Sequence, residues 1–147
     1  MTALNVVVLA AGQGKRMYSN LPKVLHKLAG KPMLQHVMDS ANALNPSKMC
    51  IVYGHGGETV RNAFADCAAV WAKQEPQLGT GHAVLQAVPH LDNDGLTLIL
   101  YGDVPLTRSD SLKQLTDVAQ SGKLAVLTIE LNDPTGYGRI VRDSKGN

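Results

Sequence analysis

The hydrophobic positions of this chain fall into short, almost wholly apolar runs that alternate with segments of helical periodicity. Apolar runs of this kind are typical of strands that are buried on both faces of a sheet. Helical periodicity is clearest after Pro32, where apolar residues recur every three or four positions from Met33 to Ala41. Strands are predicted at residues 4–9, 49–53, 69–72, 96–101, 124–130 and 138–142. Further helices are predicted at 58–66, after residues 79–81 as far as about 88, and from a capping box at 107–110 to about 121.

Strands that alternate with helices predict a parallel sheet with right-handed crossovers and helices on both faces. The predicted fold class is therefore α/β, a three-layer, mostly parallel, Rossmann-like sheet. In open sheets of this type, ligands bind beyond the carboxyl ends of the strands, at a switch in strand order. The segments expected there are the turn at Gly12 and residues 54–57, 79–81 and 101–103.

Composition narrows the class of protein. With 147 residues, 44% hydrophobic and 18% charged, the chain is predicted to be one globular domain. We expect no signal peptide, membrane span or nucleic-acid partner, and a cytoplasmic location. The net charge is only +2, and the cations gather only near residues 15–31, which favours a small anionic ligand. Cys50 and Cys67 lack metal or redox spacing and are predicted to be reduced core thiols.

The turn after the first strand is the strongest candidate for a phosphate site. Gly12 and Gly14 let backbone N–H groups approach phosphate oxygens, and Arg16 and Lys23 would add positive charge. A dinucleotide fingerprint is disfavoured because bulky Met17 occupies its third glycine position, and no acidic residue follows the second strand. The alternative is a turn that uses glycine for its geometry, with surface cations beside it.

Two further clusters point to the same edge of the sheet. Asp103 directly follows a buried strand, and its carboxylate suits Mg²⁺ that is bound jointly with substrate phosphates. The alternative role of Asp103 as a helix cap is disfavoured, since it lies too far before Thr107. Gln74 and Gln77 offer amides that suit a base edge such as uracil, beside Gly79 and Thr80, although loop amides are often simply solvated.

Several segments occur in an order that resembles one protein family: 9–17 (LAAGQGKRM), 21–33 (LPKVLHKLAGKPM), 77–83 (QLGTGHA), 101–106 (YGDVPL) and 133–140 (DPTGYGRI). The family is the N-terminal uridylyltransferase (pyrophosphorylase) domain of bacterial bifunctional N-acetylglucosamine-1-phosphate uridylyltransferase/glucosamine-1-phosphate N-acetyltransferases. The resemblance implies a nucleotide-diphospho-sugar transferase fold, of which residues 1–147 would be the N-terminal portion.

The resemblance also implies residue roles. It places Arg16 and Lys23 on the phosphates as catalytic residues, and Asp103 on Mg²⁺ and substrate. The remaining substrate-binding residues would be Leu9, Ala10, Ala11, Gly12, Gln74, Gly79, Thr80, Tyr101, Gly102 and, on the amino sugar, Gly138. The implied reaction is in-line attack of N-acetylglucosamine 1-phosphate on the α-phosphorus of UTP, which gives UDP-N-acetylglucosamine, a precursor of peptidoglycan and lipopolysaccharide, and pyrophosphate.

Members of this family extend well past the length of this chain. Their further residues carry amino-sugar contacts, a second metal ligand and a left-handed β-helix domain that acetylates glucosamine 1-phosphate and forms a homotrimer. The alternatives are another nucleotidyltransferase, which uses a different triphosphate and acceptor, and a nucleotide-binding module without catalysis.

On this interpretation the 147-residue chain binds UTP weakly and turns over little or no substrate, because the amino-sugar half of the site is incomplete. Pyrophosphate release from UTP and N-acetylglucosamine 1-phosphate, compared between this chain and a longer one, measures this directly. Equal turnover by the two chains would contradict the prediction.

Overall fold

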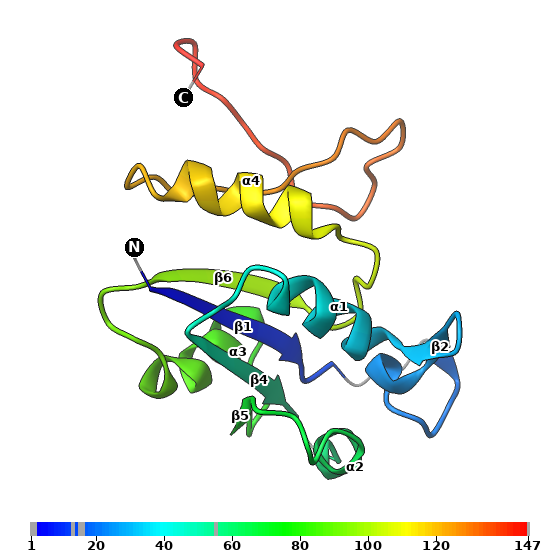
Figure 1. Cartoon of the computed structure of the whole chain (residues 1–147). Coiled ribbons are helices and arrows are strands. Elements are labelled where there is room, and N and C mark those ends of the chain that lie inside the picture. The colour runs from blue at the N-terminus through cyan, green and yellow to red at the C-terminus, as the bar shows by residue number, and fades with distance from the viewer. Residues whose placement is uncertain (1–2, 13, 15–16, 55, 147) are drawn as a thin grey trace.

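A four-stranded parallel sheet forms the centre of the molecule (Figure 1). The computed structural model describes residues 3–12, 14, 17–54 and 56–146. The strands are β1 (Leu4–Ala10), β4 (Lys48–Tyr53), β5 (Val70–Lys73) and β6 (Leu96–Tyr101), in the spatial order β5-β4-β1-β6. All neighbouring strands in this sheet are parallel, so the predicted α/β class is confirmed.

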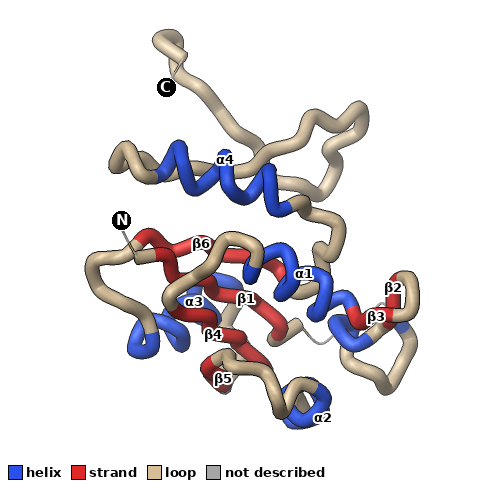
Figure 2. Tube along the Cα trace, in the orientation of Figure 1, coloured by secondary structure: helices blue, strands red, loops and turns tan. Residues whose placement is uncertain are grey.

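Helices cover both faces of this sheet (Figures 1 and 2). The helices α1 (Met33–Asn42), α2 (Glu58–Ala63) and α4 (Ser109–Ala119) pack on one face, and α3 (Thr80–Ala87) packs on the other. The described residues also form two short 3-10 turns, η2 (Lys23–Leu25) and η3 (Val88–His90). None of the helices described is long and apolar enough to cross a membrane.

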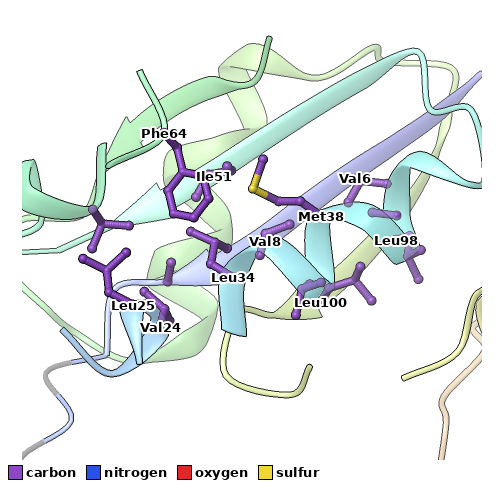
Figure 3. Packing of buried hydrophobic residues seen from close by; sticks show 14 of the residues in the cluster. Val6, Val8, Val24, Leu25, Leu34, Met38, Ile51, Phe64, Leu98 and Leu100 are labelled. Carbon is purple, nitrogen blue, oxygen red and sulfur yellow. The ribbon is translucent and has the colours of Figure 1, made fainter. Parts of the chain in front are cut away.

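The core divides into two layers because side chains of a strand alternate between the faces of the sheet. In β1, Val6 and Val8 pack toward α1, where they meet Leu34 and Met38 (Figure 3), while Val7 packs toward α3. All three valines are fully buried. This explains why the run in β1 is apolar at successive positions rather than at alternate ones.

The two cysteines are free thiols. Cys50 lies in the layer beneath α3, and burial raises the pKa of its thiol to about 11. Such a thiol stays protonated at neutral pH, so the predicted role of Cys50 as a core residue is confirmed. Cys67 is half-buried and packs against the other layer.

A small antiparallel hairpin, for which the sequence pattern gives no strand prediction, connects η2 to α1. It pairs β2 (Lys27–Leu28) with β3 (Lys31–Pro32), and the turn between them has positive φ at both Ala29 (50°) and Gly30 (81°). Lys31 Nζ donates to the Asp39 carboxylate of α1 at 2.6 Å. Burial raises the pKa of Asp39, but hydrogen bonds from Lys31 and Gln35 outweigh it and lower that pKa overall. The Lys31–Asp39 pair thereby ties the hairpin to the second half of α1.

The segments predicted as the last two strands, residues 124–130 and 138–142, are irregular in the structure. Their sequences favour strands, but a strand also needs a neighbour with which to exchange hydrogen bonds. Among the described strands, β6 pairs with β1 alone. The apolar side chains of these segments therefore stay largely in solvent, with Leu124 93% and Val141 84% exposed.

The predicted capping box at the start of α4 is also wrong. Arg108, not Thr107, is the N-cap residue, and no side chain caps the helix. Asp110 is therefore the second helical residue rather than the third, one position short of a capping box. It pairs instead with the Arg108 guanidinium at 3.2 Å.

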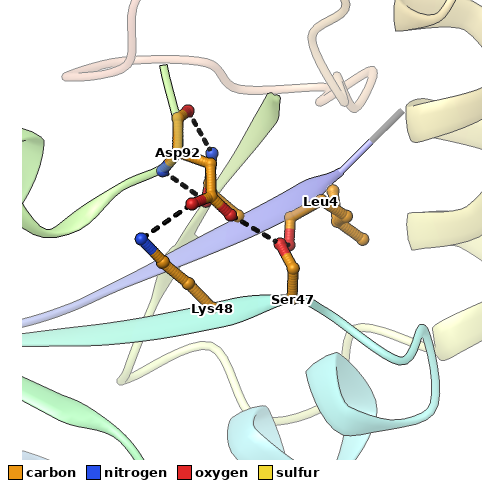
Figure 4. Close-up of polar contacts among 5 residues, drawn as sticks. Leu4, Ser47, Lys48 and Asp92 are labelled. Carbon is orange, nitrogen blue, oxygen red and sulfur yellow. Dashed lines mark hydrogen bonds and ion pairs between the residues drawn. The ribbon is translucent and has the colours of Figure 1, made fainter. Parts of the chain in front are cut away.

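A polar cluster at the amino ends of the strands joins β1, β4 and the segment before β6 (Figure 4). The buried side chain of Asn5 donates from Nδ2 to the Asp92 carbonyl and accepts the Asp92 N–H at Oδ1, both at 3.0 Å. The Asp92 carboxylate pairs with Lys48 at 2.7 Å and accepts from the Ser47 hydroxyl at 3.1 Å. The hydrogen bond from Lys48, helped by Ser47 and opposed by desolvation, lowers the pKa of Asp92.

Replacing Asn5 by Ala should destabilise the fold by about 2 kcal/mol, because the N–H and the C=O of the partly buried Asp92 would lose their hydrogen-bond partners. Urea unfolding of the variant and of the parent chain measures the difference. Asn42→Ala, at an exposed position in α1, is the control and should change stability far less. A variant of Asn5 as stable as the control would contradict this account.

Candidate functional site

A cavity of about 370 Å³ opens at the carboxyl ends of the strands. Its walls come from the ends of β1 and β6, from η2, and from the segment that joins β5 to α3. The lining residues are Leu9, Ala10, Ala11, Gly12, Lys23, Val24, Gln74, Gln77, Gly79, Thr80, Ala83, Tyr101 and Asp103. The structure thus brings together most of the predicted site residues, which lie up to 94 positions apart (9 to 103).

The strand order explains why the cavity lies here. The chain runs from β1 outward through β4 to β5, and then crosses by α3 to β6 on the other side of β1. The strand order therefore reverses beside β1, and in open parallel sheets the crevice for ligands lies beyond the carboxyl ends of the strands at such a switch. Register keeps the strand ends level: Leu9 pairs with both Val52 and Tyr101, and the Gly102 N–H continues the ladder to the Leu9 carbonyl at 2.9 Å.

Two of the predicted charged residues, Lys23 and Asp103, lie side by side in the cavity wall. Lys23, in η2, donates from Nζ to Asp103 Oδ2 at 2.7 Å. Both side chains are about one-third exposed, 36% and 35%. A phosphate group and a metal ion would each compete with one half of this pair, since phosphate attracts the ammonium and a divalent cation attracts the carboxylate.

The backbone turn that carries Lys23 depends on Gly14. Gly14 has a φ of +59°, and a Cβ at that position would lie 2.9 Å from Lys23 Cβ. A glycine at position 14 therefore lets the turn after β1 pack closely against η2. This packing role is separate from the predicted approach of the turn's backbone to a ligand.

Gln74 is almost completely buried at the inner end of the β5–α3 segment. Side chains alternate along this segment, so Lys73 and Glu75 point outward and pair at 2.7 Å, and the hydrogen bond from Lys73 to Glu75 raises the pKa of the lysine. The Gln74 N–H donates to the Tyr53 carbonyl at 2.8 Å. Its side-chain Nε2 donates to the Gly79 carbonyl at 2.9 Å and lies 3.3 Å from His82 Nδ1.

The helix α3 begins at the cavity. Its N-cap, Gly79, has a φ of +99° and leads directly into Thr80. Free N–H groups and the positive end of the helix dipole at this point favour a partly negative ligand atom. The predicted pair of Gly79 and Thr80 thus lies in the cavity wall at the start of α3.

Two predicted site residues in the described part of the chain do not line the cavity. Gly102 is buried behind it, where a Cβ would lie 3.2–3.3 Å from the Leu9 carbonyl oxygen, Leu34 and Val24. Gly138 lies in the irregular C-terminal segment. Arg16, together with its neighbour Lys15, lies outside the residues that the structure describes.

Val24 and Ala83 line the cavity, although the sequence does not predict them as site residues, and Gln77 lines it as well. Val24 and Ala83 carry no sequence signal, because an aliphatic residue in a wall looks like one in a core. Gln77 belongs to the predicted amide cluster, but nothing in its sequence context separates a loop amide that makes an internal contact from a solvated one.

A metal ion at this site would depend on the ligand for most of its coordination. Among the described residues, no group of three or more His, Cys, Asp or Glu side chains could hold a metal. Asp103 is the acidic residue in the cavity wall, and Mg²⁺ commonly takes one or two carboxylates together with substrate phosphates. The residues present therefore fit a cation that arrives with a phosphorylated ligand.

The fold and the site define a nucleotidyltransferase domain. Residues 6–142 match the family model described as the MobA-like NTP transferase domain, so the chain belongs to this family. It is 63% identical to the bifunctional protein GlmU of Nitrosospira multiformis, over 99% of this chain and 32% of that protein. The chain thus spans about a third of the length of this curated relative.

Solved structures share the fold at lower sequence identity. Rv0371c from Mycobacterium tuberculosis H37Rv matches 82% of this chain and 61% of its own, with a TM-score of 0.71 and 21% identity. A CMP:2-keto-3-deoxy-manno-octonic acid synthetase complexed with CTP covers 82% of this chain and 48% of its own, with a TM-score of 0.64 and 23% identity. These likenesses concern the fold alone.

Replacing Lys23 by Met should change the free energy of unfolding by less than about 1 kcal/mol, because a partly exposed ion pair contributes little to stability. Methionine keeps an unbranched apolar chain against the turn at Gly14. Chemical denaturation of both chains measures the change. A loss well above this range would mean that the Lys23–Asp103 pair is a structural element rather than a pair available to a ligand.

Proposed function

We propose that the chain binds UTP in the cavity and serves uridylyl transfer to N-acetylglucosamine 1-phosphate. The observation that carries the proposal is the joint placement of a glycine turn, a lysine, a single carboxylate and a buried glutamine around one opening. The GlmU relatives match nearly the whole of this chain, and their names support the same activity for those longer proteins.

The buried glutamine favours uracil over cytosine. Because Gln74 Nε2 already donates to the Gly79 carbonyl, the amide oxygen is the atom with which this side chain can meet a base. Uracil carries a hydrogen on N3 and can donate it to that oxygen. Cytosine carries a lone pair at N3, which would face the oxygen without a hydrogen bond.

The charged residues would handle the triphosphate. Lys23 would break its ion pair with Asp103 and bind the phosphates. Arg16 would add a second cation, as the sequence resemblance implies. Asp103 would hold Mg²⁺ jointly with the phosphates, and the ion supplies charge neutralisation when bound. The glycine turn after β1 and the start of α3 would orient the nucleotide, which is the main requirement of this chemistry.

The transfer needs no protein base. The phosphate of N-acetylglucosamine 1-phosphate is already ionised at neutral pH. One of its oxygens forms a bond to the α-phosphorus of UTP, the bond between that phosphorus and the α,β-bridging oxygen breaks, and pyrophosphate leaves with the electron pair. The residues that line the sugar end would be Tyr101, Gly102 and Gly138. Their roles stay predictions, and so do the roles of Leu9, Ala10, Ala11, Gly12, Gln74, Gly79 and Thr80.

Several further properties that the sequence resemblance implies remain proposals. They are acetylation of glucosamine 1-phosphate, a homotrimer, a cytoplasmic location and supply of cell-wall precursors. A nucleotidyltransferase with another triphosphate is the second candidate, and the CTP complex of the synthetase with the same fold is the observation that keeps it open.

Competition among UTP, CTP, GTP and TTP for this chain tests the proposal. UTP should bind at least about tenfold more tightly than CTP, the difference expected of one well-placed hydrogen bond. Gln74→Ala should bring the ratio of the two dissociation constants close to one. Gln114→Ala, at an exposed position on α4, should leave it unchanged. Equal binding of UTP and CTP by the parent chain would contradict the proposal.

A further inference from the structure

The two glutamines of the β5–α3 segment hold two different walls of the cavity. Gln74 donates to the Gly79 carbonyl within its own loop. Gln77 reaches much further, because its Nε2 donates to the carbonyl of Ala11, 66 positions away in the chain. Ala11 lies just past the end of β1, beyond the last paired residue of that strand. Gln77 thus connects the loop after β5 to the turn after β1.

This connection crosses the end of the strand that lies between β5 and β1. Gly54 directly follows β4, and a Cβ built on it would lie 2.7 Å from the Ala11 carbonyl oxygen and would overlap Gln77 Nε2. Gly54 is not among the glycines with positive φ, so the lack of a side chain, rather than backbone freedom, is what the position requires. The glycine makes room for the amide to pass over the end of β4.

The hydrogen bond fixes the direction of one backbone donor in the cavity wall. The peptide unit between Ala11 and Gly12 is planar, and its C=O and N–H point in opposite directions. When Gln77 holds the Ala11 carbonyl, it therefore also fixes the Gly12 N–H. Ala11 and Gly12 both line the cavity, and backbone N–H groups in such turns are donors for phosphate oxygens.

From this geometry we infer that Gln77 is a positioning residue, which aligns the Ala11–Gly12 peptide for the phosphate end of the nucleotide. The inference rests on the proposed function. It gives the two glutamines different roles, because Gln74 faces the base whereas Gln77 acts through the backbone turn. A change at Gln77 should consequently weaken every nucleoside triphosphate alike and leave the preference for uracil intact.

Two variants break the same hydrogen bond from opposite sides. Gln77→Glu keeps the size of the side chain and loses the donor, since an ionised carboxylate only accepts hydrogen bonds. Gly54→Ala adds no charge and displaces the amide by steric overlap. Gln114→Glu, exposed on α4, adds the same charge as the first variant outside the cavity and serves as its control.

The measurements are the dissociation constants of UTP and CTP and the ¹³C chemical shift of the Ala11 carbonyl in the ligand-free chain. In both variants that shift should move as the carbonyl loses its donor, and both dissociation constants should rise about tenfold with their ratio unchanged. The control should match the parent chain in all three values.

The inference is overturned if the Ala11 shift moves while UTP binds within twofold of the parent, or if the preference for UTP collapses in Gly54→Ala. An unmoved Ala11 shift in both variants also overturns it, because the hydrogen bond would then not form in solution. Failure of the parent chain to bind any triphosphate overturns the proposed function and this inference together, and is recognised before any variant is made.

Discussion

The parallel pairing of β1 on both of its edges is the constraint on which the rest of the molecule depends. β4 and β6 reach β1 from opposite directions of the chain, and Leu9 is level with Val52 on one side and with Tyr101 on the other. A shift of one residue in either register would turn the side chains of that strand to the opposite face of the sheet. It would also separate the Gly12 turn from Asp103. Core packing and site assembly are therefore consequences of the same register.

The two ends of the sheet use similar charged pairs for different purposes. At the amino ends, Lys48 and Asp92 form a pair that Ser47 supports, while Asn5 holds the backbone of Asp92, and the lowered pKa of Asp92 reflects this network. At the carboxyl ends, Lys23 and Asp103 form a pair at the same distance, 2.7 Å, in the wall of an open cavity. The first pair ties elements together, whereas the second keeps opposite charges where an anion and a cation would enter.

Much of this arrangement follows from local sequence. Buried strands such as β1 and β6 are predictable because they are continuously apolar, and α1 because its apolar residues repeat at helical spacing behind Pro32. Asp103 and the Gly12 turn are predictable because polar or glycine residues follow buried strands. The grouping of these segments in one cavity agrees with the rule that carboxyl ends of parallel strands meet at one edge.

The remainder depends on contacts that local sequence does not encode. Residues 124–130 are as apolar as a strand, but pairing requires a neighbour, and the described part of the chain gives them none. Gln77 looks like any loop amide until Ala11 and Gly54 are placed beside it. The sequence resemblance predicts Gly102 as a ligand contact, whereas its closest neighbours are Leu9, Leu34 and Val24.

The central claim, that the cavity at the carboxyl ends binds a uridine nucleotide, is tested most directly by following backbone amide resonances during a titration with Mg²⁺ and UTP. The account predicts that the resonances of Ala11, Gly12, Gly79 and Thr80 shift, while those of Asn5 and Asp92 at the opposite end of the sheet stay in place. Shifts that gather away from the cavity, or no shifts at all at millimolar UTP, would contradict it.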